Sequence, residues 1–147
     1  MRKLRLLGLI GVLSLAVLLG SCLTFENPFV FDNSLAPEEQ TSLAFIGIIP
    51  TSYNGISLTE SMSYVVFPRG IIDFTANINS QLGNTIYTGK DAIFQYNFEG
   101  NKTYPLYFAI KDGLWGVNIY DGLPSSTGSQ KNITHLAFVP FSNQRTN

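Results

Sequence analysis

Residues 41–141 predict an all-β fold, an antiparallel β-sandwich of about seven or eight short strands. Apolar and polar residues alternate with a period of two in several segments, as on a strand with one buried face. Turn signals rich in Gly, Asn, Asp and Pro recur between these segments. No stretch after Cys22 keeps a helical apolar period over three turns. Strands and turns in this order are typical of a sandwich.

The first strands are expected between residues 43 and 67. Leu43–Ile49 is apolar on both faces, as in a central strand buried on two sides, and Pro50 interrupts it. Asn54-Gly55 follows a short strand and suits the positive φ angles of a type I′ hairpin turn. Tyr64–Phe67 predicts the next short strand.

The clearest alternation follows the Pro68-Arg69-Gly70 turn. Within Ile71–Asn79 one face is predicted to enter the core and the other to face water, and the core face carries Ile72, Phe74, Ala76 and Ile78. Residues 80–91 are polar and contain two glycines, which predicts a long loop with a short strand around Ile86-Tyr87.

Two further hairpins are predicted. Ala92–Phe98 is an alternating strand, and Glu99–Lys102 is a four-residue connection to a return strand, Thr103–Ile110. Pro105 cannot donate to a ladder, which indicates an edge strand or a bulge. The tight turn Lys111–Gly113 then leads into the next strand.

The end of the chain continues the same pattern. Apolar and polar residues alternate in Leu114–Tyr120, with Trp115 among the apolar ones. Residues 121–132 are predicted to form a polar loop. Ile133–Phe141 is the last predicted strand, and residues 142–147 are expected to be a disordered tail.

The start of the chain has the three parts of a secretory signal. Arg2, Lys3 and Arg5 are followed by an uncharged run, Leu6–Leu19, and by small residues before Cys22. Leu18-Leu19-Gly20-Ser21-Cys22 resembles the lipobox of bacterial lipoproteins. Residues 1–21 are therefore predicted to be a signal-peptide helix. Two alternatives stay open: an uncleaved membrane anchor, although the apolar run falls short of the roughly 20 residues that span a bilayer, and a plain secretory signal.

The lipobox resemblance implies that Cys22 becomes the acylated first residue of the mature chain. Two or three acyl chains anchor a protein durably, because each buried methylene adds about 0.8 kcal/mol. Residues 22–40 are then a lipidated N-terminus and tether, although Phe25, Phe29 and Phe31 leave a loosely packed first strand as a second interpretation. Leu23 is not the aspartate that retains enteric lipoproteins in the inner membrane, so the expected localisation is the cell envelope, with the outer membrane favoured.

Composition and charge exclude some classes of partner and some sources of stability. The 126 residues after the leader fit one domain and carry six Lys or Arg against ten Asp or Glu, a formal charge of −4. This charge argues against nucleic acid as a partner. Cys22 is the only cysteine. A disulfide is therefore excluded, and stability must come from packing of the aromatic residues, all of which follow Cys22.

Three turn motifs resemble PEGA-like modules found in small bacterial lipoproteins. They are Tyr53-Asn54-Gly55-Ile56, the segment from Phe67 to Phe74 that begins Phe67-Pro68-Arg69-Gly70, and Phe98-Glu99-Gly100-Asn101-Lys102-Thr103-Tyr104. The resemblance covers roughly residues 40–120 and implies a prealbumin-like β-sandwich, with spirochaete lipoproteins as an expected setting. It implies no catalytic residue.

No set of residues predicts catalysis. His135 is the only histidine, no Gly-x-Ser-x-Gly elbow occurs, and Cys22 is expected to be acylated. His135 is therefore predicted to be an ordinary histidine on a sheet surface. The chain lacks the several Cys and His ligands that a zinc site needs. Asp112 with Asp121 is a weak candidate for a calcium site. We expect no enzyme activity, no metal and no cofactor.

Three aromatic residues are the candidates for contact with a ligand or partner: Tyr107, Trp115 and Tyr120. By strand alternation Tyr107 and Tyr120 face away from the core that contains Trp115. Exposed aromatic residues dock partners or stack on sugars, whereas the simpler interpretation is cross-strand packing. The predicted function is a lipid-anchored structural or protein-interaction module with an envelope protein partner. The alternative is a carbohydrate- or small-ligand-binding module that uses an exposed aromatic face.

Overall fold

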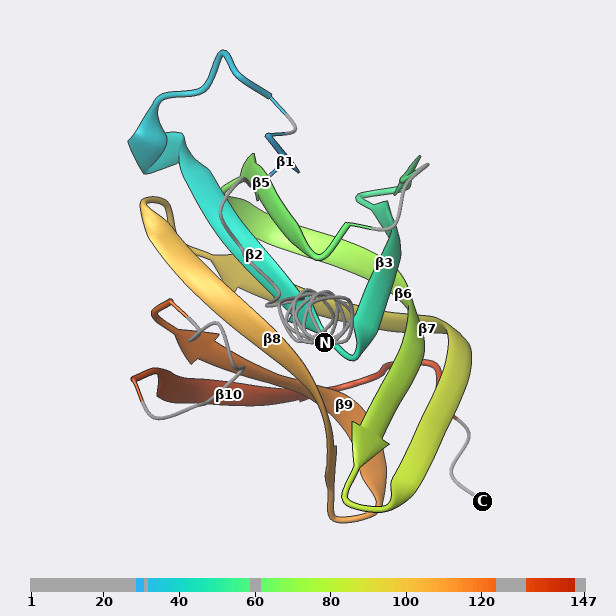
Figure 1. Ribbon diagram of the computed structural model, residues 1–147. Helices are drawn as coiled ribbons and strands as arrows, with labels where there is room; N and C mark the ends of the chain where they lie inside the picture. The colour runs from blue at the N-terminus through green and yellow to red at the C-terminus, as the bar shows by residue number, and fades with distance from the viewer. Residues whose placement is uncertain (1–28, 31, 59–61, 124–131, 145–147) are drawn as a thin grey trace, which may run out of the picture.

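The structure is a computed structural model that describes residues 29–30, 32–58, 62–123 and 132–144 (Figure 1). The leader, Cys22 and residues 23–28 lie outside these ranges. The signal peptide, the lipidation and the first part of the tether therefore stay predictions. Within the described ranges, no helix has the length and apolar character needed to cross a membrane.

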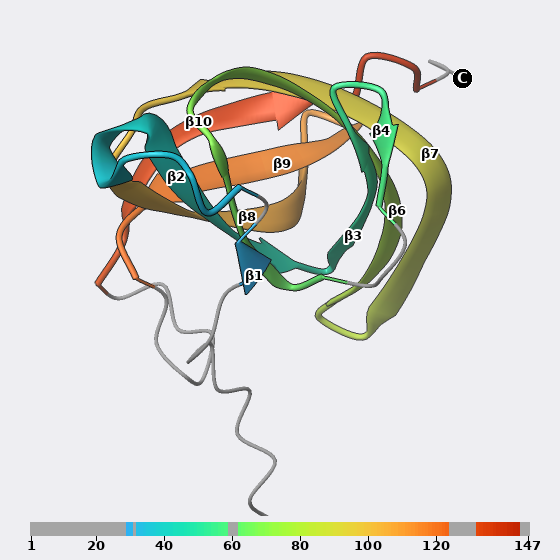
Figure 2. The same cartoon turned by 90° about the horizontal axis from the view of Figure 1, so that it is seen from above.

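The described residues form two β-sheets, which confirms the predicted all-β sandwich. The six-stranded sheet has the order β1 (Phe29–Val30), β5 (Tyr64–Pro68), β2 (Gln40–Ile46), β8 (Lys102–Lys111), β9 (Leu114–Asp121) and β10 (Thr134–Pro140). The four-stranded sheet has the order β4 (Ile56–Ser57), β3 (Ile48–Tyr53), β6 (Gly70–Leu82) and β7 (Thr85–Phe98). Seen from above, the two sheets enclose a shared interior (Figure 2).

Most strand pairs are antiparallel, as predicted, and two are parallel: β1 with β5, and β2 with β8. The parallel pair β2–β8 joins segments from the two halves of the chain, with Leu43 opposite Tyr104. β2 therefore lies between β5 and β8, with neighbours on both edges. This central position agrees with the apolar character of both its faces.

The core between the sheets is a cluster of aromatic rings around Phe74, which is 1% exposed. Phe74 contacts Phe45 and Phe67 from the six-stranded sheet at ring-centroid distances of 5.5 and 5.4 Å. Phe94 of the neighbouring strand stacks on it at 5.3 Å. Aromatic pairs of this kind contribute about 0.5–1.5 kcal/mol each beyond the area they bury. Phe74 thus links the two sheets, and the predicted core face of β6 is confirmed.

The chain passes from one sheet to the other at Gly47, between β2 and β3. The predicted strand Leu43–Ile49 is therefore two strands in different sheets. The prediction that Pro50 interrupts it is also wrong, because β3 continues through Pro50 with only a bulge beside it. Gly47 has φ +72°, a region that residues with a side chain adopt with strain. The bend also packs against β6, where Asn79 N–H donates to the Gly47 carbonyl at 3.1 Å.

The predicted long loop at residues 80–91 is also wrong, although the short strand predicted around Ile86-Tyr87 does lie in a strand, β7. β6 and β7 continue through this segment and pair as far as Leu82 and Thr85, so that Gly83-Asn84 is a two-residue turn. A bulge opposite Asn77 places Asp91 at φ +56°, and the hairpin bends there. The polar residues misled the prediction because this end of the hairpin lies beyond the core and most of its side chains face water.

The connection Glu99–Lys102 does not close a hairpin, because β7 and β8 belong to different sheets. The prediction of an edge strand or a bulge at Pro105 is wrong too, since β8 lies between β2 and β9. The pairing of β8 with β9 begins at Leu106, one residue after Pro105. Pro105 therefore stands just outside the ladder with β9, while on its other side it pairs with Ala44 of β2.

The other predicted turns and strands agree with the structure. Asn54-Gly55 and Asp112-Gly113 have the positive φ angles of type I′ hairpin turns. The strands predicted at Tyr64–Phe67, Leu114–Tyr120 and Ile133–Phe141 correspond to β5, β9 and β10 within one or two residues.

Both ends of the described chain are bound to the sheets. β1 pairs with β5 inside the segment predicted as a tether, in line with the second interpretation of a first strand at Phe29. The disordered tail predicted from residue 142 does not hold for Ser142–Gln144. Ser142 N–H donates to the Ile93 carbonyl of β7 at 2.8 Å, and Gln144 bonds to the backbone of Trp115 in β9. These residues therefore bridge β7, an edge strand of the four-stranded sheet, and β9 of the six-stranded sheet.

We predict that Gly47→Ala destabilises the fold more than Gly83→Ala does. Both glycines have positive φ, so each change adds strain of about 1–2 kcal/mol. A methyl group on Gly47 would also overlap the side chain of Ser80, whereas nothing lies within 4 Å of one on Gly83. For Gly47→Ala this overlap adds a further destabilisation of about 1–3 kcal/mol. Urea denaturation of both variants measures the difference.

The double variant Gly47→Ala/Ser80→Gly is the control, because it removes the overlap and keeps the strained φ. It is expected to lose less stability than the sum of its two single changes. Equal losses for Gly47→Ala and Gly83→Ala would show that the contact with Ser80 does not restrict this corner.

Candidate functional site

The structure separates the three predicted contact residues into two places. Tyr107 and Tyr120 lie on the outer face of the six-stranded sheet, and their rings meet edge to face at 5.5 Å. Trp115 lies on the opposite face, where it packs against Tyr87 and Phe108 at 5.5 and 5.3 Å. The predicted directions of these side chains are confirmed, but Tyr120 is only 9% exposed and the three residues do not form one exposed aromatic face.

The outer face of the six-stranded sheet is apolar and aromatic near Tyr107 and Tyr120. Ala44 is 0% exposed and Val66 is 7% exposed, yet neither belongs to the core cluster between the sheets. The Phe138 side chain covers Gly116 on the same face, because a Cβ atom on Gly116 would overlap that ring. We call this surface, defined by Ala44, Val66, Tyr107, Tyr120 and Phe138, the apolar outer face.

Polar groups lie beside the apolar outer face. His135 is exposed, its ring packs edge to face on Tyr120 at 5.2 Å, and its Nε2 lies 3.2 Å from Asn118 Oδ1. This agrees with the prediction of an ordinary surface histidine. Burial raises the pKa of the Tyr107 hydroxyl above its usual value, and the nearby Tyr120 adds to the shift. Tyr107 therefore remains a neutral hydrogen-bonding group over the physiological pH range.

The outer face of the four-stranded sheet is different. Asp73 and Gln95 are exposed there and are joined by a hydrogen bond of 2.6 Å from Gln95 Nε2 to Asp73 Oδ1. Asn79 and Asn97 are also exposed. This sheet shows the usual division into one face for the core and one for water. Among the described residues, the six-stranded sheet has buried apolar residues on both of its faces, whereas the outer face of the four-stranded sheet mixes these polar residues with the exposed Ile71 and Ile93.

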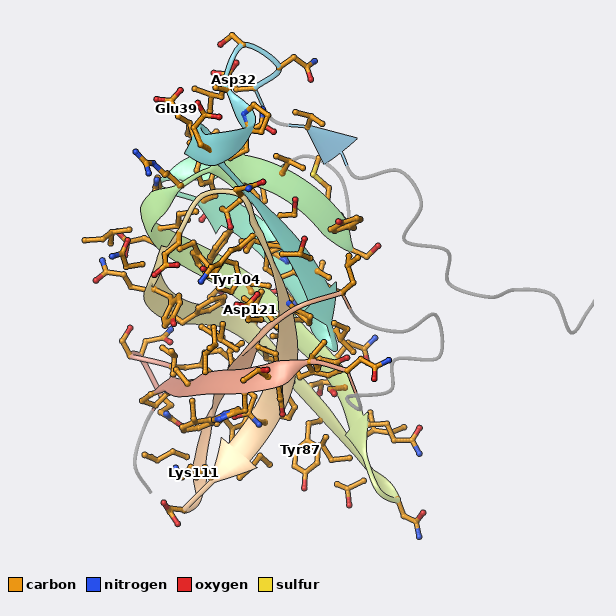
Figure 3. All side chains as sticks on the ribbon, turned by 90° about the vertical axis from the view of Figure 1, so that its left-hand side faces the viewer. Asp32, Glu39, Tyr87, Tyr104, Lys111 and Asp121 are labelled. Atoms are coloured by element: carbon orange, nitrogen blue, oxygen red, sulfur yellow. The ribbon has the colours of Figure 1, made fainter. Side chains whose placement is uncertain are left out.

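A cleft of about 640 Å³ lies beside Trp115. Three segments line it: the β6–β7 hairpin, the β8–β9 turn with the start of β9, and the C-terminal residues. Its apolar lining comes from Ile78, Ala92, Leu114, Trp115 and Phe141, and its polar lining from Lys90, Asp112, Asn143 and Gln144. In Figure 3, Tyr87 of the β6–β7 hairpin and Lys111 of the β8–β9 turn lie at the same end of the molecule.

Sequence reasoning found Trp115 but missed most of this cleft. Lys90 lies in the segment predicted as a loop, and Asn143 and Gln144 lie in the predicted disordered tail. In residues 80–91, side chains that alternate direction at Ile86, Tyr87 and Thr88 were a local signal for a strand. No local pattern predicts the position of Asn143 and Gln144, because their hydrogen bonds are to residues of β7 and β9.

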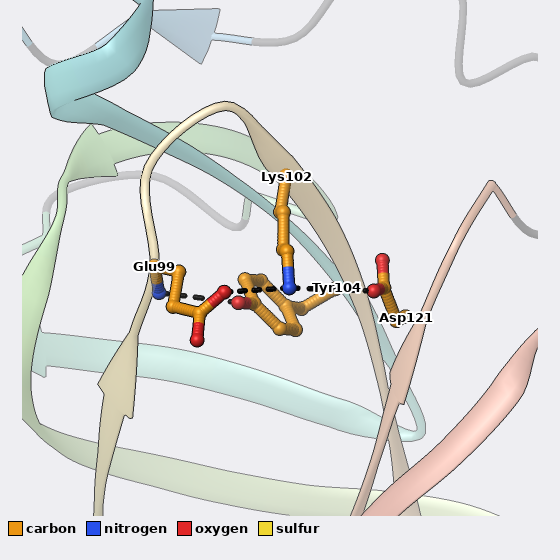
Figure 4. Close-up of polar contacts among 4 residues, drawn as sticks. All are labelled: Glu99, Lys102, Tyr104 and Asp121. Atoms are coloured by element: carbon orange, nitrogen blue, oxygen red, sulfur yellow. Dashed lines mark hydrogen bonds and ion pairs between the residues drawn. The ribbon is translucent and has the colours of Figure 1, made fainter.

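A second polar cluster lies where β7 passes into β8 (Figure 4). Lys102 Nζ is 2.6 Å from Glu99 Oε2 and 3.6 Å from Asp121 Oδ2. The hydrogen bond with Glu99 raises the pKa of Lys102. Because all three side chains are partly exposed, we assign them a small structural contribution, tying the turn to the end of β9.

Tyr104 fixes the same turn from inside. It is 2% exposed, and its hydroxyl oxygen accepts a hydrogen bond of 3.1 Å from Glu99 N–H. Burial raises the pKa of Tyr104, and the bond from Glu99 and the charge of Lys102 oppose part of that shift.

The weak calcium candidate is not formed, because Asp112 and Asp121 lie at opposite ends of β9. Within the described ranges, no three His, Cys, Asp or Glu side chains gather in a way that could hold a metal ion.

Comparison with protein-family models, with curated proteins and with solved structures gave no match. The resemblance to lipoproteins and to PEGA-like modules therefore stays a prediction.

We predict that Tyr104→Phe reduces the loss of stability at alkaline pH. The folded chain binds the Tyr104 proton more tightly than the unfolded chain, whose tyrosines titrate near pH 10. The stabilisation is complete below about pH 10 and is lost as the pH rises through the folded pKa. Unfolding free energies from urea denaturation between pH 8 and 11 are expected to fall less steeply in the variant. An equally steep fall would show that the raised pKa of Tyr104 does not cause the loss of stability at alkaline pH.

Proposed function

We propose that this chain is a lipid-anchored lipoprotein of a bacterial cell envelope, and that its β-sandwich is a non-enzymatic module for structural or protein interactions. The apolar outer face of the six-stranded sheet is the main support for this proposal. Its residues Ala44, Val66 and Tyr120 lie outside the core cluster and yet are only 0, 7 and 9% exposed. The outer face of the four-stranded sheet instead carries exposed polar residues beside Ile71 and Ile93. An apolar centre with polar neighbours is typical of a protein interface.

The proposed partner is an envelope protein that presents an apolar surface and hydrogen-bonding groups. Asn118 and His135 supply polar contacts beside the aromatic residues. A net charge of −4 after the leader gives no attraction to an anionic lipid surface or to nucleic acid. A protein is therefore a better occupant of this face than a membrane.

The position of the lipobox cysteine supports the same proposal. Cys22 is seven residues before Phe29, which begins β1, so a fully extended connection reaches about 25 Å. β1 pairs with β5 at one edge of the six-stranded sheet. An acylated Cys22 would hold this edge within that distance of the bilayer, where envelope proteins are concentrated. Leu23 favours the outer membrane as the destination.

The anchor is tested by the mass of the N-terminus of the chain expressed in a bacterium with a lipoprotein pathway. We expect a chain that begins at Cys22 and carries acyl groups, with incorporation of labelled palmitate. Cys22→Ser is expected to abolish the label and the cleavage, whereas Ser21→Ala keeps a small residue before the cysteine and should retain both. An unlabelled chain that keeps residues 1–21 would indicate an uncleaved anchor, and an unlabelled cleaved chain a plain secretory signal.

The interaction is tested by photocrosslinking in intact envelopes. A photoreactive amino acid at Asn118 beside the apolar outer face is expected to form one discrete adduct with an envelope protein, identified by mass spectrometry. The same group at Gln95, on the polar outer face, is the matched control and is expected to form no discrete adduct. A second copy of the chain, lipid alone, or equal adducts from both positions would contradict the proposal.

A further inference from the structure

We infer that the cleft beside Trp115 binds a neutral saccharide, with the indole of Trp115 as its platform. This inference goes beyond the proposed function, because the cleft does not include the apolar outer face. It also differs from the aromatic face predicted from the sequence, since it uses Trp115 without Tyr107 or Tyr120.

The cleft has the size and the position of a small-ligand site. Its volume of about 640 Å³ lies within the range of about 300–1,000 Å³ that is common for such sites. It lies where two hairpins and the C-terminal residues converge, so that its walls come from both sheets. A molecule bound there would contact rigid strands on two sides.

Backbone hydrogen bonds hold Trp115 in place, and among the described residues none of its hydrogen bonds uses the indole N–H. Its backbone N–H donates to Gln144 Oε1 at 2.8 Å, and its carbonyl accepts from Gln144 Nε2 and Phe141 N–H at 3.0 Å each. Tyr87 and Phe108 make T-shaped contacts with the indole ring at interplanar angles of 88° and 80°. The platform is therefore ordered before any ligand arrives, which reduces the entropy lost on binding.

The charged groups of the cleft balance each other. Lys90 comes from β7 and Asp112 from the β8–β9 turn, and both are exposed. In the part of the chain that the structure describes, the ion pairs are those of Lys102, so Lys90 and Asp112 are available to a ligand. Lys90 supplies donors, and Asp112 supplies acceptors.

This combination fits a neutral polyhydroxylated ring better than other ligands. A purely apolar chain would bury Lys90 and Asp112 without hydrogen-bond partners, which is unfavourable. An anion would be attracted by Lys90 but repelled by Asp112. A sugar presents C–H groups to the indole face and hydroxyl groups that both accept from lysine and donate to a carboxylate.

Trp115 is the only tryptophan of the chain, so fluorescence excited at wavelengths that the seven tyrosines do not absorb reports on this cleft alone. The full chain in detergent is titrated with neutral mono- and oligosaccharides of glucose, galactose and N-acetylglucosamine. A saturable change in Trp115 emission, with protection from acrylamide quenching, is expected for at least one of these sugars.

Two variants test the polar contacts and a third is the control. Lys90→Met and Asp112→Asn each remove a charged hydrogen-bonding group and are expected to weaken binding about tenfold or more. Asparagine tolerates the positive φ of residue 112, so the turn is kept. Lys111→Met removes a neighbouring exposed lysine that does not line the cleft, and binding should be unchanged.

Several results would overturn the inference. One is the absence of a saturable response to every sugar at concentrations above about 1 mM, which corresponds to a binding free energy of only about −4 kcal/mol. Another is a response to a fatty acid or to inorganic phosphate in place of sugars. Equal weakening by Lys90→Met and Lys111→Met would also show that binding lies outside the cleft.

Discussion

The packing of aromatic rings around Phe74 is the interaction on which the rest of the structure depends. The only cysteine lies before the domain, so no disulfide joins the two sheets. Phe45 and Phe67 from one sheet and Phe94 from the other contact the same ring. Removing such a ring from a core typically destabilises a protein by about 3–5 kcal/mol, a large part of the stability of a small domain.

The bends at which the chain passes between the two sheets bring these rings together. Gly47 and Gly70 both have positive φ, and each lies where the chain leaves the six-stranded sheet for the four-stranded one. A long β6–β7 hairpin then extends beyond the core, and the bulge at Asp91 bends it. The cleft beside Trp115 is a consequence of this geometry, because the hairpin and the β8–β9 turn enclose space that the core does not fill.

The two proposed binding surfaces use opposite faces of the same strands. Tyr107 and Tyr120 point outward from β8 and β9, while Phe108 and Trp115 point inward. Because side chains alternate along a strand, one sheet can present a partner surface on one side and a ligand cleft on the other. Under the proposed lipid anchor, the domain would contact a protein on one side of this sheet and a saccharide on the other.

The sequence by itself determined most of the strand segments, the Asn54-Gly55 and Asp112-Gly113 turns, and which way Tyr107, Trp115 and Tyr120 point. These properties follow from alternation and from residues such as Asn54-Gly55, which act locally. Only the tertiary structure decided that β8 pairs with β2, that residues 80–91 extend a hairpin, and that Asn143 and Gln144 join Trp115 in a cleft. The physical reason is that these features depend on hydrogen bonds and packing between residues distant in the chain, which no local pattern records.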